Sequence, residues 1–209
     1  MSTYYSLVFT YDRKTLTHSS VTKFYNALIS AGAEFKGGAY EGSKLTLSEI
    51  TDINSKKLLE NYELGYDEDC ANDYKQALFA VEGFSYARVF IMNNDPTEGE
   101  YYFHLIVNEN EVMSAGTRIR CKKDSTDRLL TLAKRVMKAT RALLVQTEPE
   151  ICRETVSYEG YKSTGQINAY PFALAFNTAG AADKRYYTSF SEEELDVIYD
   201  KEYNFTERI

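Results

Sequence analysis

The sequence is poor in the residues that build metal cages, disulfide frameworks and catalytic centres. Its 209 residues include no Trp, three Pro, three Cys and two His. Cys70, Cys121 and Cys152 are widely spaced and form no CxxC pair. An odd number of isolated cysteines excludes a disulfide framework and a structural zinc cage, and it is typical of reduced thiols in a reducing compartment.

Long apolar runs are absent too. Unbroken apolar runs such as 89–92 and 142–145 cover only a few residues, whereas a membrane-spanning helix needs about 20. The first residues show no basic segment followed by an apolar core and a cleavage site, so no signal peptide is predicted. We therefore expect a cytoplasmic protein that does not enter a membrane.

Motifs for nucleotide binding and hydrolysis are also missing. The glycine-rich segment 36–42 matches neither the P-loop nor the GxGxxG pattern, and we interpret it as a turn. The sequence contains no GxSxG elbow, no HExxH and no kinase signature. The acidic residues 67–73 lack the glycine turn and final glutamate of a calcium loop. We therefore predict no catalytic residue, no cofactor and no metal site.

The composition that is present indicates a folded domain. Apolar residues make up 44% of the chain and charged residues 26%, which are ordinary globular values and oppose intrinsic disorder. No linker rich in Pro, Gly or Ser divides the chain. We therefore expect a single domain over residues 1–209.

Charge is strongly segregated along the chain, although its net value is only −7. Residues 118–141 contain nine bases and two acids, whereas residues 60–73 contain six acids and no base. Residues 191–209 contain seven acids and two bases. The negative total opposes nucleic-acid binding. The basic segment should face either the chain's own acidic segments or an acidic partner.

Apolar periodicity predicts four helices. The clearest covers residues 125–146, with one apolar and one basic face, and a second covers residues 19–31 and ends at Gly32. A shorter helix is predicted over 55–62. A last one is predicted over 191–199, because Ser-Glu-Glu-Glu matches the capping-box pattern.

Alternating and β-branched segments predict the strands. They cover residues 4–11, 45–50, 77–81, 86–92, 100–107, 151–156, 167–176 and 185–190. The order of elements mixes hairpins with helical crossovers. We therefore predict an α+β fold, with a mainly antiparallel sheet packed by about four helices in two layers.

The histidines and cysteines offer little chemistry. His18 has the His-x-Ser spacing of two-histidine phosphoesterases, but those enzymes need the motif twice, and the site at His104 lacks the hydroxyl. We expect His104 to be a half-buried strand residue. Cys121 lies among basic residues before a helix, which would lower its pKa. We nevertheless favour a structural or incidental thiol.

Tyrosine is the most unusual component, with 18 copies and adjacent pairs at 4–5, 101–102 and 186–187. Neighbouring residues on a strand point to opposite faces, so the two members of a pair cannot share one buried face. Either the sheet is covered on both sides or some tyrosines lie at the surface. Surface tyrosines would indicate a binding surface, since this residue is enriched at protein interfaces.

These observations predict a non-enzymatic protein-binding module. Its acidic, tyrosine-bearing surface would dock a protein partner of basic character, as inhibitors and immunity proteins of nuclease-type toxins do. The residues predicted to bind the partner are Tyr62, Tyr66, Asp67, Glu68, Asp69 and Asp73.

Two alternatives remain open. One is an enzyme that acts on a phosphate-bearing small molecule through Lys36, His18 or the basic cluster at 118–123. The other is a structural subunit of a homo-oligomer with tyrosines at the subunit contact.

Overall fold

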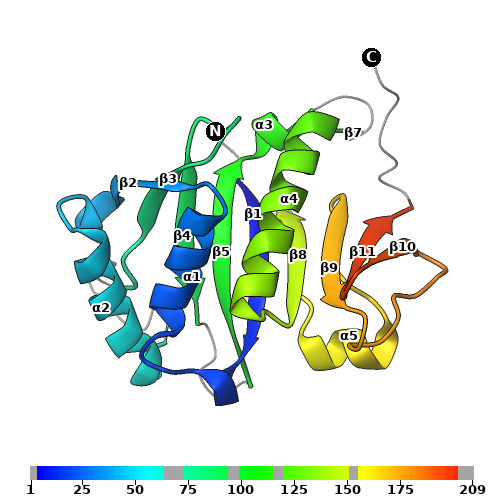
Figure 1. Ribbon diagram of the computed structural model, residues 1–209, viewed down its shortest axis with the longest axis horizontal. Coiled ribbons are helices and arrows are strands. Elements are labelled where there is room, and N and C mark those ends of the chain that lie inside the picture. The colour runs from blue at the N-terminus through cyan, green and yellow to red at the C-terminus, as the bar shows by residue number, and fades with distance from the viewer. Residues whose placement is uncertain (1–3, 64–72, 94–98, 115–119, 151–154, 202–209) are drawn as a thin grey trace.

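The computed structural model describes residues 4–63, 73–93, 99–114, 120–150 and 155–201 (Figure 1). It is an α+β structure dominated by a large antiparallel sheet, which confirms the predicted class. The helical elements are η1 (Arg13–Thr15), α1 (Ser20–Ser30), η2 (Tyr40–Gly42), α2 (Leu47–Leu59), α3 (Glu109–Val112), α4 (Lys123–Thr140) and α5 (Tyr158–Thr164). The strands are β1 (Tyr4–Asp12), β2 (Glu34–Gly38), β3 (Ala77–Ala80), β4 (Ala87–Met92), β5 (Glu100–Asn108), β6 (Met113–Ser114), β7 (Arg120–Cys121), β8 (Leu144–Pro149), β9 (Phe172–Phe176), β10 (Tyr187–Glu192) and β11 (Leu195–Asp200).

Nine of these strands form the main sheet, in the order β10-β11-β9-β8-β1-β5-β4-β3-β2. Each neighbouring pair is antiparallel. The first strand, β1, lies in the middle of the sheet, where Phe9 is opposite Phe103 of β5 and Val145 of β8. Because side chains alternate along a strand, this register fixes which residues of the central strands share a face.

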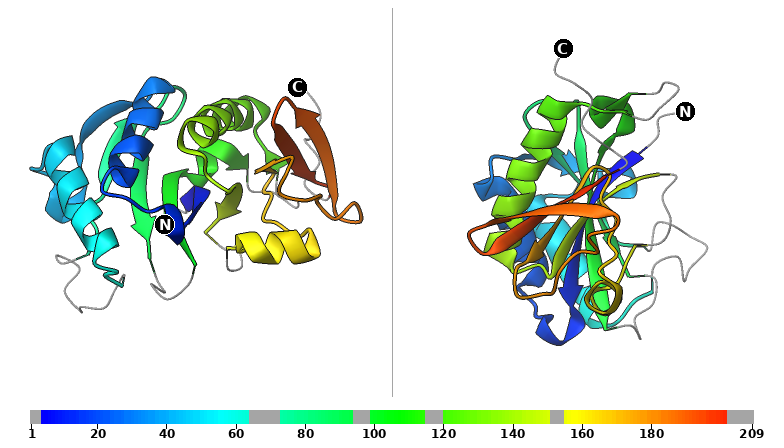
Figure 2. Two further views of the ribbon diagram at one scale, coloured as in Figure 1. Left: turned by 60° about the horizontal axis from the view of Figure 1, so that its bottom comes forward. Right: turned by 90° about the vertical axis from the view of Figure 1, so that its right-hand side faces the viewer.

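Helices α1, α2 and α4 cover one face of the sheet (Figure 2). The odd-numbered residues of β1 and β5 point to this side and are buried. The Phe24 ring of α1 stacks on Phe103 with 4.3 Å between ring centroids and meets Phe9 edge-on at 5.2 Å. Burial of each such side chain contributes about 1.5–3 kcal/mol. This aromatic cluster therefore fixes α1 on the sheet.

The opposite face is covered by α5 and the segment that follows it, but only over β8, β9 and β11 (Figure 2). Tyr161 of α5 and Ile167 are buried there against Ala173, Ala175 and Ile198. None of the described helices lies over the neighbouring strands β1, β5, β4 and β3 on this side. We call this part of the sheet the open face. In the described part of the chain, no helix is both long and apolar enough to cross a bilayer.

The predicted helix over 125–146 was too long at its C-terminal end. Helix α4 ends at Thr140, because Arg141 adopts a left-handed conformation with a φ of 60°. Residues 144–149 form β8, in which every residue is buried. The strand is buried on both faces and begins with the leucine and valine that a helix face would also carry, so periodicity alone could not separate the two.

Two other predicted elements were wrong in type. Residues 45–50 were predicted as a strand, but they begin α2, whose first residues are held by a reciprocal capping box between Thr46 and Glu49. Residues 191–199 were predicted as a helix, but they form the β10–β11 hairpin, with Glu193 in its turn at a φ of 54°. A capping box thus begins a helix at Thr46, whereas the same sequence pattern at Ser191 does not.

Smaller differences concern the rest of the chain. The segment 36–42 is a turn only in part, because 34–38 form the edge strand β2. The predicted strand over 151–156 lies mostly outside the described residues, and Thr155 and Val156 belong to no strand. Helix α5 had not been predicted.

Candidate functional site

The open face is built from three rows of side chains that run across the strands. The rows follow directly from the register of β4, β5, β1 and β8. They are Arg88-Ile106-Ser6-Glu148, Phe90-His104-Val8-Gln146 and Met92-Tyr102-Thr10-Leu144. The face therefore carries one positive and one acidic end, joined by apolar, aromatic and polar residues. Several of these residues are buried, namely Val8, Thr10, Ile106, Leu144 and Gln146. The first three lie on β1 and β5, which no described helix covers on this side.

The adjacent tyrosines divide between the two faces as the alternation predicts. Tyr5 and Tyr101 are buried under the helices, whereas Tyr4 and Tyr102 lie on the open face and are half-buried. One member of each of these two pairs therefore belongs to the core under the helices, and the other is partly accessible on the opposite face. Tyr40, which contacts the same region, is 61% exposed.

A shallow groove of about 410 Å³ crosses the open face. Arg88 and Glu148 both line it, and Phe90, Met92 and Ile106 form its apolar part. Neighbouring strands are about 4.8 Å apart, so the backbones of Arg88 and Glu148 are separated by roughly 14 Å across three strand spacings. The groove thus offers a long, mixed surface.

Arg88 defines one end of this groove. Its Nη1 donates a hydrogen bond of 2.8 Å to the Tyr40 hydroxyl. The guanidinium carbon lies 5.0 Å from the centre of the Tyr4 ring and 5.5 Å from that of Tyr40. Two cation–π contacts therefore hold the guanidinium in place.

Glu148 defines the other end. Its carboxylate accepts hydrogen bonds from Asn168 Nδ2 at 2.9 Å and from Thr155 Oγ1 at 3.2 Å. Gln146, two residues earlier, is also buried and binds the backbone of Val156 and Asn168. Burial raises the pKa of Glu148 above its ordinary value, although these hydrogen bonds oppose the shift.

His104 lies between the two ends, in the middle row. It is half-buried, as predicted, and burial lowers its pKa to about 4. Its imidazole is therefore neutral at pH 7. Sequence reasoning identified this residue but could not connect it to Arg88 and Glu148, because that connection depends on strand order.

Only the two ends of the predicted acidic, tyrosine-bearing surface fall within the described residues. Tyr66, Asp67, Glu68 and Asp69 lie outside the described residues, whereas Tyr62 and Asp73 lie within them. The hydroxyl of Tyr74 donates to the Tyr62 carbonyl at 2.7 Å, and Asn93 Nδ2 donates to the same carbonyl at 2.7 Å.

These hydrogen bonds tie both ends of the acidic segment to the edge of the open face, since Asn93 directly follows Met92. The Tyr62 ring itself is half-buried and packs against Tyr74 and the Lys57 ammonium, which lies 3.8 Å from the ring centre.

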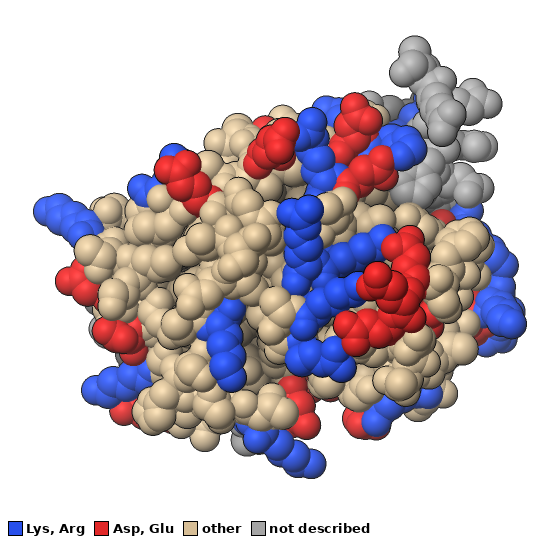
Figure 3. All heavy atoms as spheres, in the orientation of Figure 1, with Lys and Arg blue, Asp and Glu red and all other residues tan. Residues whose placement is uncertain are grey.

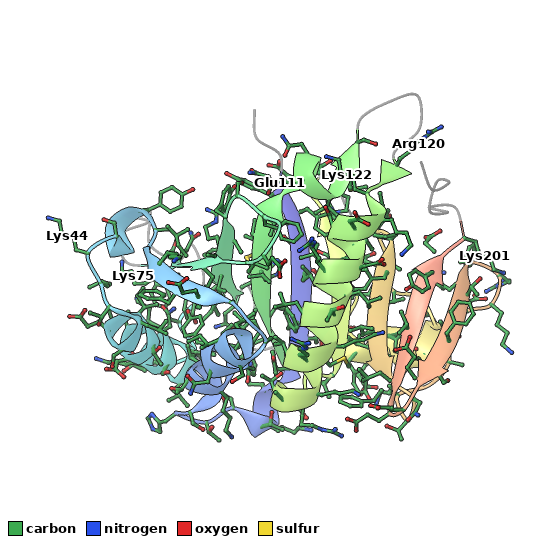
Figure 4. All side chains as sticks on the ribbon, turned by 45° about the horizontal axis from the view of Figure 1, so that its top comes forward. Lys44, Lys75, Glu111, Arg120, Lys122 and Lys201 are labelled. Carbon is green, nitrogen blue, oxygen red and sulfur yellow. The ribbon has the colours of Figure 1, made fainter. Side chains whose placement is uncertain are left out.

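The groups proposed for an enzyme do not converge among the described residues. His18 follows the Asp12 end of β1, and Lys122 follows the opposite end through α3. Nine residues of strand span about 30 Å. Lys36 is paired with Glu34 at 2.6 Å on β2. Figure 4 shows Arg120 and Lys122 where α4 begins, and Lys122 Nζ donates to the Asn110 carbonyl at 2.6 Å.

Cys121 is buried, and burial raises its pKa to about 12. The neighbouring bases and the helix start therefore do not make it a reactive thiolate, which agrees with the interpretation as a structural thiol. Cys70 and Cys152 lie outside the described residues. In the described part of the chain, no three acidic, histidine or cysteine side chains are grouped to hold a metal ion.

The basic face of α4 lies against the acidic residues 192–194 of the same chain. Lys134 pairs with Glu192 at 2.5 Å, Arg141 pairs with Glu194 at 2.8 Å, and Lys138 pairs with Glu193. Figure 3 shows these cations and carboxylates side by side on one surface of the molecule. The contact with Glu193 raises the pKa of Lys138, and Lys138 lowers the pKa of Glu193. Three cations of this basic region are thus paired with carboxylates of the same chain.

We predict that changing Glu192, Glu193 and Glu194 together to Gln lowers the urea midpoint of unfolding slightly in low salt. Exposed ion pairs are weak and screened, so the loss should disappear in 1 M NaCl. Asp52→Asn, which removes an exposed acid of α2, should show no such salt dependence. An equal loss at both salt concentrations would mean that the hairpin is not held electrostatically.

Comparison with known proteins gives no family. No protein-family model matches the chain, and no curated protein matches it. Among solved structures, it is similar to one titled "Pseudomonas aeruginosa T6SS protein PA0821". The sequences are 9% identical, the TM-score is 0.38, and the match covers 95% of this chain and 68% of the other. A likeness at this level says nothing about function.

Proposed function

We propose that this chain is a non-enzymatic protein-binding module, an inhibitor or immunity protein, that docks a protein partner. The open face supports this proposal most strongly. Tyr4, Phe90, Met92 and Tyr102 are half-buried there, without a described helix over them. One face of an antiparallel sheet can face water, but that face is then normally polar. Aromatic residues and methionine on such a face are typical of a protein interface.

The acidic residues 60–73, whose described ends lie near Asn93, support a partner of basic character. Residues 60–73 carry six acids and no base, and their described ends are fixed at Asn93. Opposite charge accelerates association and selects among partners. An inhibitor that occludes a basic active site would need such a combination of acids and aromatic residues.

The proposal predicts that neutralising the acidic segment weakens partner capture. The variant carries Asp67→Asn, Glu68→Gln, Asp69→Asn and Asp73→Asn. The control variant neutralises four exposed acids elsewhere, at Asp52, Glu82, Asp124 and Glu159. Both changes alter net charge equally. Partners are identified by mass spectrometry after capture from a lysate of the source organism, and affinity is then measured with the purified partner.

We expect the segment variant to bind about tenfold more weakly or worse, and the control variant to bind like the wild type. Addition of the chain should also suppress the partner's activity at a molar ratio of one. Equal affinity of the two variants would show that the acidic segment is not the docking surface.

A homo-oligomer subunit is the second candidate, and strand β10 favours it. β10 is an edge strand of the sheet, and its Phe190 is 57% exposed. Exposed edge strands can pair with a second copy of themselves. A monomeric mass in solution at high concentration would remove this candidate.

A further inference from the structure

Arg88 is a buried cation without an opposite charge among the described residues. Only 9% of its surface is exposed, and none of the described ion pairs includes it. Its Nε is buried and has no hydrogen-bond acceptor in the described part of the chain. Its contacts are the Tyr40 hydroxyl and two aromatic rings. A buried charge is costly unless it is paired, so this arrangement favours an anion.

Side chains that line the groove around Arg88 are largely shielded from solvent, since Glu148 is 9% exposed and Ile106 is 7% exposed. His104 and Glu148 line the same groove, and burial shifts the pKa of each toward its neutral form. An anion that pairs with Arg88 here would interact through a lower effective dielectric than it would in water. The pair would therefore be stronger than an ordinary surface ion pair.

The surroundings of Arg88 select the kind of anion. Ile106 is its cross-strand neighbour, and Phe90 is the next residue of β4 on the same face. A ligand that reaches Arg88 along the groove therefore contacts apolar side chains. Arg88 supplies a single positive charge, and the groove also contains the acids Glu148 and Glu150. The negative charge of Glu150 disfavours a more highly charged anion such as phosphate, whereas a carboxylate carries one charge and fits the planar guanidinium.

We propose that the groove binds a carboxylate carried on an apolar body, with the carboxylate on Arg88 between Tyr4 and Tyr40 and the apolar body on Phe90 and Ile106. Tyr40 is exposed and lies on η2, so its side chain can shift as the ligand enters. The ligand's carboxylate supplies the acceptor that Nε lacks. This site does not include the acidic segment, but it lies on the open face, so its ligand and the proposed partner would occupy the same surface.

The test measures the binding of four probes to the full chain at pH 7, by NMR chemical shifts and by calorimetry. N-acetyl-phenylalanine offers a free carboxylate, and N-acetyl-phenylalaninamide is its uncharged match. N-acetyl-glutamyl-phenylalaninamide offers a side-chain carboxylate of the kind that a protein presents, and inorganic phosphate is a compact anion, part monoanion and part dianion at this pH, without an apolar body. Both carboxylates should bind, and the amide and phosphate should bind about tenfold more weakly or worse.

Matched variants locate the site. Arg88→Met keeps an unbranched apolar side chain and should abolish binding of both carboxylates, whereas Arg88→Lys should retain weak binding. Arg128→Met is the control, because Arg128 is an exposed arginine of α4 that pairs with Glu82. Its binding should match the wild type. If Arg88→Met does not fold, the affinities of Arg88→Lys and Tyr40→Phe for both carboxylates are compared with those of the wild type instead.

The outcomes are distinct. Tighter binding of the free acid would indicate a small-molecule ligand, and tighter binding of the blocked dipeptide would indicate a protein side chain; both support the site. Equal binding of acid and amide, equal binding of phosphate, unchanged binding by Arg88→Met, or no binding of either carboxylate at about 10 mM would each overturn it.

Discussion

Phe103→Ala should lower the free energy of unfolding by about 3–5 kcal/mol, the usual cost of removing a fully buried aromatic ring. Phe103 lies in the middle of β5 and is 1% exposed. Its ring stacks on Phe24 at an interplanar angle of 11° and meets Tyr11 edge-on at 5.5 Å. The substitution therefore removes the contact that joins α1 to the centre of the sheet. Urea unfolding followed by far-UV circular dichroism measures the loss, since the chain has no Trp.

Phe190→Ala is the matched control for this prediction. It removes the same side chain from the edge strand β10, where the ring is exposed. We expect a change of about 0.5 kcal/mol or less. Similar losses for the two variants would show that the aromatic cluster under α1 does not dominate the core.

His104→Gln should remove a large part of the acid sensitivity of the fold. The pKa of His104 is about 4 in the folded chain, against an ordinary value of 6.5. Between these values the unfolded chain binds a proton that the folded chain does not, so stability falls as the pH decreases from about 7 to 4. A difference of this size is worth about 3 kcal/mol. Below pH 4 both states are protonated and the loss stops growing.

Glu148 acts in the opposite direction. Its pKa is raised in the folded chain, so its contribution to stability is complete at low pH and is lost as the pH rises through that raised value. The measurement is therefore the difference between wild type and variant at pH 4 and at pH 7. His18→Gln is the control, because His18 is exposed at the start of α1. Acid sensitivity that is unchanged in His104→Gln and reduced in His18→Gln would contradict the account.

Much of the N-terminal part of the fold follows from local sequence. β1, α1, β3, β4 and β5 lie within a few residues of their predicted bounds. In each of them the apolar pattern has one period, and Gly32 at a φ of 107° ends α1 as expected. Local propensity and tertiary burial agree in these elements, so sequence patterns are sufficient.

The C-terminal part shows where such patterns fail. β8 was merged with α4, because the sequence between them offers only Arg141 as a stop and no glycine. The acids 192–194 form the end of a hairpin because Leu195, Val197 and Ile198 of β11 pair with β9 and are buried there. Their carboxylates also meet the cations of α4 across the structure. Sheet pairing and burial override the local helix signal, and a single sequence does not reveal them.

The candidate site was also predictable only in part. The alternation of Tyr4 with Tyr5 and of Tyr101 with Tyr102 predicted aromatic residues on both faces of the sheet. The row from Arg88 to Glu148 was not predictable, because it depends on the order of four strands. One local signal did exist, since Arg88 is the single charged residue within β4.

The central claim is that the open face docks a protein partner, and site-specific photo-crosslinking tests it most directly. A benzoyl-phenylalanine replaces the half-buried Phe90 on the open face in one variant and Ile29 on α1, which is 42% exposed, in another. Illumination in the presence of the captured partner should give a covalent complex from position 90 and none from position 29. A complex from position 29 alone, or from neither position while the partner is bound, would contradict the claim.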